Sequence, residues 1–306
     1  MSRDSRDNSN MYANVFSFLN LPFCEDISDS DADVAILGLP YDLATSGRPG
    51  TRSGPNAIRQ ASSNLRWEEA RWPWPFELQD RLRVTDCGDV QFYQGDHEAF
   101  VAECERRAAE IIGANKKLLS FGGDHYVALP LLRQHAKKYG KLALIHFDAH
   151  TDTDEDGWLY DHGAMFHHAR MEGLLDEQRC VQVGIRTWYE PGNHPFRVID
   201  ANQACAQSAE SVSAAIAETV GDGPAYISFD IDCLDPAFAP GTGTPVAGGL
   251  SSNQALSILR GLQGLELVGM DVVEVAPAYD HSQITALAAA TLGLEFLYLL
   301  AAGRGD

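Results

Sequence analysis

Short apolar runs alternate with longer helical patterns along this 306-residue chain, and that alternation is the strongest constraint on its fold. The predicted strands span residues 33–40, 83–89, 116–124, 141–148, 180–186, 225–232 and 265–274. The predicted helices span residues 97–116, 126–140, 208–221, 252–264 and 284–303. Such alternation indicates an α/β protein with parallel strands joined by helical crossovers. Because the runs are almost entirely apolar, helices should cover both faces of an open three-layer sheet or the outside of a closed barrel.

Composition and sequence complexity favour one large domain. Hydrophobic residues make up 45% of the chain, which is enough for a sizeable core. The sequence contains no internal repeat, no linker-like tract and no low-complexity segment. We therefore predict a single domain over residues 1–306, in which residues 1–30 form an N-terminal arm that could take part in subunit contacts.

The net charge of −20 limits the partners of the chain. Such an acidic surface disfavours nucleic acids and anionic lipids and favours metal ions or small cationic molecules, although many cytoplasmic proteins are simply acidic. The six cysteines form no C-x-x-C pair and indicate reduced thiols. The N-terminus lacks an apolar signal core, and no apolar window is expected to be long enough to span a bilayer. We therefore expect a cytoplasmic protein without membrane or nucleic-acid partners.

Polar residues follow the predicted strand at residues 141–148. The segment ALIHFDAHTDTDEDG passes from an apolar run into Asp148, His150 and Asp152. If the chain stays extended past the strand, these alternate side chains point to one side. They would lie at the carboxyl end of a parallel strand, which is where open α/β sheets bind ligands.

Two other predicted strands end in the same kinds of residue. One run ends in Asp230 and Asp232, and another ends in two glycines followed by Asp124 and His125. Four carboxylates in one dry crevice would repel each other and lose their charge unless cations compensated them. The candidate metal ligands are therefore His125, Asp148, His150, Asp152, Asp230 and Asp232.

Charge balance and ligand type predict a dinuclear centre. Two divalent cations balance four carboxylates, and paired ions about 3.5 Å apart form a recurrent hydrolytic site. An oxygen-rich ligand set with imidazoles and no thiolate suits Mn²⁺ better than structural zinc. Other roles are predicted for three neighbours. His146 should pack in the core, Asp235 should form a turn, and Asp124 should bind backbone amides or support a ligand.

Three separate strings in the chain resemble those of a known family. GGDHY, FDAHTD and SFDIDCLDPAFAPGTGTPV together resemble the arginase/agmatinase (ureohydrolase) family, with the closest likeness to bacterial agmatinases. Residues 44–62, 161–166 and 269–280 extend the resemblance over nearly the whole chain. The resemblance implies a three-layer α/β/α fold around a mostly parallel eight-stranded sheet. It also implies two manganese ions per subunit and a trimeric or hexameric homo-oligomer.

The resemblance also implies a role for each ligand. One ion would be bound by His125, Asp148, Asp152 and Asp230. The other would be bound by His150, Asp148, Asp230 and Asp232. In that arrangement Asp148 and Asp230 bridge the two ions. The reaction of the family is hydrolysis of a guanidinium group to urea and an amine, by a hydroxide that the two ions generate from water.

Three further residues match functional positions of the family. His162 matches the histidine that shuttles protons, and its ordinary pKa near 6.5 suits that role. Glu274 matches the carboxylate that pairs with the substrate guanidinium, which a carboxylate can bind bidentately. Thr244 matches a minor substrate contact, and His162 also lies at the substrate. We count Asp152 with His162 and Glu274 as catalytic; without the resemblance, His162 would be interpreted as an exposed loop residue and Thr244 as a turn residue.

The loop TDEDGWLYD, residues 153–161, bears on the choice of substrate. It lacks the Asn and Ser groups that bind the amino-acid end of the substrate in arginases. Its acidic residues would repel a carboxylate and attract an ammonium, although they could simply face solvent. These residues are Asp154, Glu155, Asp156 and Asp161.

The sequence therefore predicts hydrolysis of agmatine to putrescine and urea, a step of polyamine biosynthesis. One alternative on the same scaffold is a guanidino-acid hydrolase that acts on 4-guanidinobutyrate or 3-guanidinopropionate. A non-catalytic regulatory homologue is a second alternative, but it would have no need for the full set of ligands. A deacetylase with one zinc ion is a third, but the duplicated carboxylate pairs favour two ions.

Overall fold

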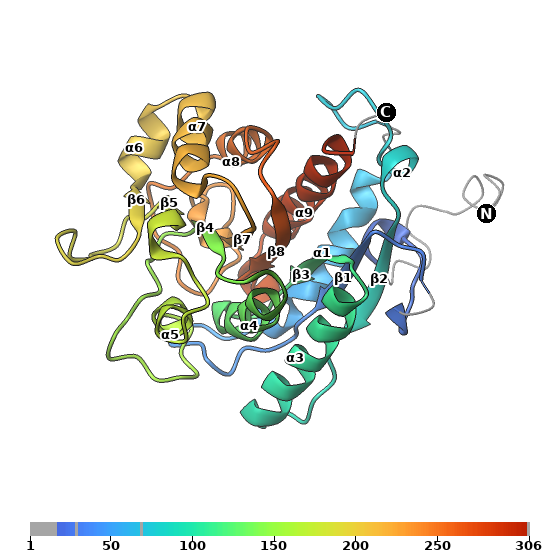
Figure 1. Cartoon of the computed structure of the whole chain (residues 1–306), viewed down its shortest axis with the longest axis horizontal. Coiled ribbons are helices and arrows are strands. Elements are labelled where there is room, and N and C mark those ends of the chain that lie inside the picture. Colours follow the sequence, from blue (N-terminus) through green and yellow to red (C-terminus); the bar gives the residue numbers. More distant parts are fainter. Residues whose placement is uncertain (1–16, 28–29, 68–69, 305–306) are drawn as a thin grey trace.

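The computed structural model describes residues 17–27, 30–67 and 70–304, and these form an eight-stranded parallel sheet between two layers of helices (Figure 1). The strand order is β2-β1-β3-β8-β7-β4-β5-β6. The strands are β1 (Val34–Gly38), β2 (Val84–Asp89), β3 (Lys117–Phe121), β4 (Ala143–Phe147), β5 (Val181–Val183), β6 (Arg197–Ile199), β7 (Ala225–Asp230) and β8 (Leu267–Val273). The predicted three-layer α/β/α fold is confirmed, and the sheet is open rather than closed into a barrel.

Helices cover both faces of the sheet. They are α1 (Gly54–Ser62), α2 (Leu78–Arg81), α3 (His97–Gly113), α4 (Ala128–Tyr139), α5 (Met165–Met171), α6 (Ala201–Ala206), α7 (Ala209–Val220), α8 (Ser252–Arg260) and α9 (Ile284–Ala302). The apolar residues of α1, α7, α8 and α9 pack on one face, and those of α3, α4 and α5 pack on the other (Figure 1). Alternation along each strand supplies both layers: in β1, Ile36 faces the first group of helices and Leu37 the second.

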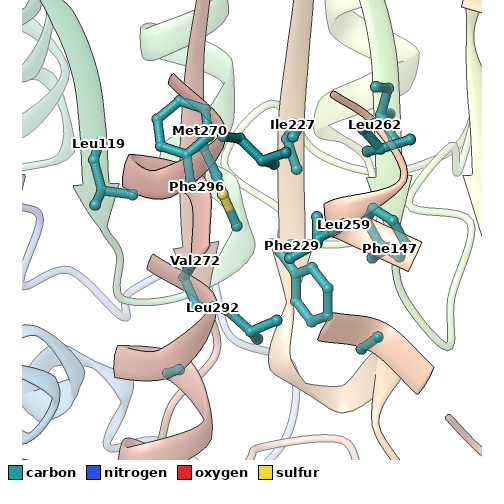
Figure 2. Packing of buried hydrophobic residues seen from close by; sticks show 14 of the residues in the cluster. Leu119, Phe147, Ile227, Phe229, Leu259, Leu262, Met270, Val272, Leu292 and Phe296 are labelled. Atoms are coloured by element: carbon teal, nitrogen blue, oxygen red, sulfur yellow. The ribbon is translucent and has the colours of Figure 1, made fainter. Parts of the chain in front are cut away.

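The core beneath α8 and α9 is closely packed around the central strands. Figure 2 shows this packing, with labelled side chains that include Phe147, Ile227, Phe229, Leu259, Met270, Val272, Leu292 and Phe296. The rings of Phe147 and Phe229 stack with their centroids 4.9 Å apart. Burying each such side chain contributes about 1.5–3 kcal/mol, so the middle of the sheet is a rigid support for the residues at its carboxyl edge.

Helix α9 corrects one expectation from the sequence. The prediction that no apolar window is long enough to span a bilayer is wrong, because α9 has the required length and composition. Its most apolar window is 78% buried within the protein, so α9 here serves as a core helix that covers the sheet. Its one charged residue, Glu295, is buried and accepts hydrogen bonds from the side chains of Trp74 and Arg260.

Several short elements were not predicted from the sequence. Strand β6 has three residues at the edge of the sheet, and α1, α2, α5 and α6 have nine residues or fewer. Part of the predicted N-terminal arm lies outside the described residues. Within the described part, Phe18 is buried and its ring lies 4.9 Å from that of Phe121.

The register of the central strands aligns their carboxyl ends. Phe147 of β4 pairs with Phe229 of β7, which in turn pairs with Val272 of β8. Val272 pairs with Phe121 of β3 on its other side. The residues that follow these four positions must therefore meet at one edge of the sheet, where open α/β folds bind ligands.

Candidate metal centre

The chain after β4 turns sharply instead of staying extended. β4 ends at Phe147, and Asp148 Oδ1 accepts a hydrogen bond from the His150 backbone N–H at 2.6 Å. Asp152 has a left-handed backbone, with φ of 52°. The predicted alternation along an extended strand is therefore wrong. The predicted convergence still occurs, because the turn places Asp148 and Asp152 against the same ring nitrogen of His125.

His125 lies at the centre of a buried group of carboxylates. Its Nδ1 is 2.9 Å from Asp152 Oδ2, 3.1 Å from Asp148 Oδ2 and 3.4 Å from Asp230 Oδ2. All four side chains are at most 9% exposed. Three of the predicted ligands, from the ends of β4 and β7, thus surround a fourth that follows β3.

A second group shares Asp148 with the first. His150 Nδ1 is 3.3 Å from Asp148 Oδ1 and 3.1 Å from Asp232 Oδ2. The two oxygens of Asp148 therefore face different histidines, which suits a carboxylate between two ions. In the described residues, the candidate ligand atoms that lie within reach of one ion form two groups, and neither includes Asp230. The Oδ1 atom of Asp230 accepts a hydrogen bond from the Asp232 backbone N–H at 2.7 Å. Its bridging role stays a prediction.

The ring of His125 supports the presence of a cation. Its Nε2 contacts Ser228 Oγ at 2.8 Å, and Ser228 donates its hydroxyl proton to Asp271 Oδ1 at 2.7 Å. Ser228 must therefore accept from Nε2–H, so a neutral ring presents the lone pair of Nδ1 to three carboxylates. Among the described residues Nδ1 has no hydrogen-bond partner, and a metal ion between these groups would bind its lone pair and balance the carboxylates.

The carboxylates also need compensating charge. Burial and the charge of Asp148 raise the pKa of Asp152, and the same two causes raise the pKa of Asp232 to about 6. Burial and Asp232 raise the pKa of Asp230 well above its usual range. Bound cations would reverse these shifts, and the carboxylate–imidazole set fits divalent metal ions.

Glu274 follows β8 and points into the same region. It is fully buried, and its backbone is left-handed with φ of 64°, a strain typical of functional sites. Its Oε1 accepts the His125 backbone N–H at 2.9 Å and His162 Nδ1–H at 2.8 Å. Its Oε2 is buried and has no partner in the described part of the chain, so a cationic ligand would satisfy it.

His162 is held between Glu274 and Ser46. In the neutral ring Nε2 accepts the Ser46 backbone N–H at 3.1 Å and lies 2.8 Å from Ser46 Oγ, and the one ring proton is on Nδ1. Burial lowers the pKa of His162, but the hydrogen bond and charge of Glu274 outweigh burial and raise it to about 9. His162 is buried rather than an exposed loop residue. Ser46 was not identified from the sequence, although it lies in the segment 44–62 that carries part of the resemblance.

The remaining sequence predictions have mixed outcomes. Asp235 accepts backbone N–H groups from Ala237 and Gly248, which confirms its turn role. Asp124 Oδ2 accepts the Ala44 backbone N–H at 2.8 Å, the first of its two predicted roles. Thr244 lines the cleft and donates to Asp232 Oδ2 at 3.3 Å.

Arg186 is a supporting residue that the sequence did not reveal. Its guanidinium donates hydrogen bonds to the backbone carbonyl groups of Asp232, Cys233 and Val246. These bonds fix the short 3-10 turn (Ile231–Cys233) that carries Asp232. A single arginine at the start of a loop gives no sequence signal for such a role.

A cleft of about 910 Å³ opens from the metal centre to the surface. Asp152, Asp230 and His162 line its inner part. Its outer part is strongly acidic and is lined by Asp154, Glu155, Asp156, Asp161 and Glu190. The exposed side chain of Trp188 also lines the cleft. The cleft is large enough for a small organic cation and has the opposite charge.

A buried cluster of histidines and carboxylates at the carboxyl ends of an open parallel α/β sheet defines a metal-dependent hydrolase. The model of the arginase family matches residues 32–298, and the chain belongs to the arginase family. It is therefore a metal-dependent ureohydrolase that acts on a guanidino C–N bond.

Relatives and solved structures agree with this assignment. The agmatinase of Serratia proteamaculans (strain 568) is 59% identical over 298 residues, 97% of either chain. The crystal structure of a hypothetical agmatinase from Burkholderia thailandensis superimposes with a TM-score of 0.92 at 47% identity, covering 97% of this chain and 94% of that one. Proclavaminate amidino hydrolase from Streptomyces clavuligerus gives a TM-score of 0.91 at 37% identity, covering 96% and 100%. The resemblance to bacterial agmatinases is confirmed.

Proposed function

We propose that this protein hydrolyses agmatine to putrescine and urea as a single ureohydrolase domain over residues 1–306. The observation that carries the proposal is the buried Oε2 of Glu274, which has no partner among the described residues and belongs to a carboxylate bonded to His125 and to His162 of the cleft lining. Agmatine has a guanidinium at one end and an ammonium at the other, so it matches the buried carboxylate of Glu274 behind His162 and the carboxylates that line the cleft. The high identity to agmatinases over nearly the full length supports the same substrate.

The proposed metal ligands are the six residues that the sequence predicted: His125, Asp148, His150, Asp152, Asp230 and Asp232. Two divalent ions bound there would supply an activated water near neutral pH. The oxygen-rich set with two imidazoles and no thiolate favours Mn²⁺. In this assignment Asp148 bridges the ions, which is supported by the different histidines that its two oxygens face.

Glu274 and His162 would orient the substrate and move its protons. A guanidinium that donates to Glu274 Oε2 would be fixed in one plane by a charge-assisted hydrogen bond. His162 lies against the same carboxylate, so its ring is within reach of the departing amine and could protonate it. Asp152 would complete the catalytic set through its contact with His125, and Thr244 would orient Asp232 while it contacts the substrate.

The mouth of the cleft would select the far end of the substrate. A carboxylate there, as in arginine or a guanidino acid, would meet the acidic loop of residues 153–161 and Glu190. An ammonium would be attracted to them and could stack on the face of Trp188. This charge pattern favours agmatine over the guanidino acids.

The setting of the enzyme is also a proposal. We propose a cytoplasmic homo-oligomer, a trimer or a hexamer, that needs neither nucleic acid nor membrane. All six cysteines are free thiols, which supports a reducing compartment. Sedimentation velocity would give the oligomer count directly.

A urea-release assay on manganese-loaded protein tests the substrate. It should compare agmatine, arginine, 4-guanidinobutyrate and 3-guanidinopropionate under the same conditions. One charge-assisted hydrogen bond contributes about 1.5–3 kcal/mol, so kcat/KM for agmatine should exceed the others by at least about tenfold. A higher kcat/KM for either guanidino acid would overturn the choice of agmatine.

A further inference from the structure

Strands β4 and β5 carry two polar side chains where only apolar ones are expected. His146 of β4 and Gln182 of β5 are paired in register, and both are completely buried. His146 was predicted to be a packed core residue, and its ring does lie against that of Phe166, with the centroids 4.5 Å apart. Packing alone does not explain a buried imidazole next to a buried amide, because each must find hydrogen-bond partners.

The hydrogen bonds of this pair have one consistent direction. The amide Nε2 of Gln182 lies 2.7 Å from the carbonyl oxygen of Thr151, which can only accept, so the orientation of the amide is fixed. The same nitrogen lies 2.9 Å from His146 Nδ1, which must therefore accept as well. His146 then carries its proton on Nε2 and donates it to Asp148 Oδ2 at 2.8 Å.

This direction separates His146 from the metal ligands. Its Nε2 lies close to the ligand atoms of His125, Asp148 and Asp152, and by position alone it could bind an ion. With both ring nitrogens engaged in hydrogen bonds, it has no free lone pair for a metal. It instead holds the oxygen of Asp148 that faces His125.

The other end of the chain of hydrogen bonds reaches the cleft. Gln182 Oε1 accepts from His194 Nε2–H at 2.6 Å, and His194 lines the wall of the cleft. Gln182 thus connects three places: the cleft wall at His194, the turn after β4 at Thr151 and the imidazole of His146. His194 and Thr151 lie in segments without regular secondary structure, whereas Gln182 lies in a strand. The hydrogen bonds of Gln182 therefore attach these two segments to the rigid sheet.

We propose that His146 and Gln182 are positioning residues, which orient the carboxylate of Asp148 and the turn after β4 for metal binding. This inference rests on the proposed ligand role of Asp148. Residues that hold a ligand in place usually change metal affinity by about 10–100-fold when they are removed. We therefore expect the affinity for Mn²⁺ to depend on both residues even though neither binds the ion.

The test measures the Mn²⁺ affinity of the metal-free, full-length protein by competition with a chelator. His146→Leu and Gln182→Met should each weaken Mn²⁺ binding by about 10–100-fold. His146→Gln should restore most of the affinity, because its amide N–H can replace the Nε2 donor to Asp148. Thr85→Val is a matched control, since it removes a part-buried hydrogen bond from the Thr85 hydroxyl to the Pro22 carbonyl, on β2 at the far edge of the sheet. It should leave the affinity unchanged.

Two results separate this inference from the metal-centre proposal. If Asp148→Asn binds Mn²⁺ as the unaltered protein does, the ligand role of Asp148 is wrong. If Asp148→Asn loses the metal but Gln182→Met and His146→Leu keep normal affinity, the positioning role is overturned and the metal centre stands. A His146→Gln variant no better than His146→Leu would also overturn it. Should His146→Leu fail to fold, Gln182→Met and His146→Gln still decide the matter.

Discussion

Replacing Glu274 by Gln is the sharpest test of how the substrate binds. Oε1 of Glu274 accepts two hydrogen bonds, from the His125 backbone and from His162, whereas Oε2 accepts none from residues 17–27, 30–67 and 70–304. In Glu274→Gln the amide oxygen would keep the two existing bonds, and the NH₂ group would take the place of Oε2. A guanidinium would then meet a donor instead of a charged acceptor.

The size of the effect follows from this geometry. Loss of one charge-assisted hydrogen bond costs about 1.5–3 kcal/mol, and the facing donors add to it, so we expect about 2–4 kcal/mol in total. That corresponds to a loss of about 30- to 1,000-fold in kcat/KM for agmatine. The assay is urea release from manganese-loaded protein over a range of agmatine concentrations.

Metal content and stability serve as the controls for this variant. Glu274 is not a proposed ligand, so bound manganese should be unchanged. Burial and the charge of Glu274 raise the pKa of Asp124, so the variant relieves one buried repulsion, but it also removes the charge that stabilises protonated His162. Thermal unfolding therefore serves only to show that the variant is folded. Glu266→Gln is the control substitution. Glu266 immediately precedes the first residue of β8, at the end of the strand away from the site, so this variant should keep full activity. A Glu274→Gln enzyme within threefold of the unaltered protein would refute the proposed guanidinium contact.

Three further predictions concern single residues around the site and the core. The pKa of His162 is raised from 6.5 to about 9 in the folded protein, so its protonated form stabilises the fold fully below pH 6.5 and this contribution is lost as the pH rises through 9. His162→Asn should therefore be less stable in the metal-free state by up to about 3 kcal/mol near pH 6, and a gap that does not shrink toward pH 9.5 in denaturant titrations would contradict this. Ser228→Ala removes the acceptor of His125 Nε2–H and should weaken Mn²⁺ binding about 10–100-fold; chelator competition that gives an unchanged affinity would exclude this supporting role. Arg59→Met leaves the buried carboxylate of Asp86 without its ion-pair partner and should cost about 3–5 kcal/mol in urea unfolding, whereas a cost below 1 kcal/mol would mean that the pair contributes little.

The features that the sequence predicted correctly are those that repeat along it. Apolar runs marked seven of the eight strands, and three of these runs ended in the residues that we propose as metal ligands. Strand β6 was not predicted, because its three residues lie at the sheet edge, are only partly buried and form no apolar run. Helix α1 was not predicted for a similar reason, because it has few apolar positions and one of its buried residues is Arg59.

The residues that support the site could not be identified in the same way. Their roles depend on contacts between neighbouring strands, which the sequence of one strand does not reveal. Ser228, His146 and Asp271 each interrupt an apolar strand with a polar residue, and that interruption is a usable signal. Their partners follow only from the register, as with His146 and Gln182. The left-handed turn at Asp152 depends on tertiary contacts, so the sequence pattern wrongly indicated an extended chain there.

The central claim is that the buried carboxylates are held together by two divalent ions. The most direct measurement is the manganese content per chain after metal-free protein is reconstituted with Mn²⁺ and freed of excess ions, determined by inductively coupled plasma mass spectrometry. The account predicts two manganese ions per chain, and fewer in Asp148→Asn. A fully folded chain that retains one ion or none at saturation would contradict it.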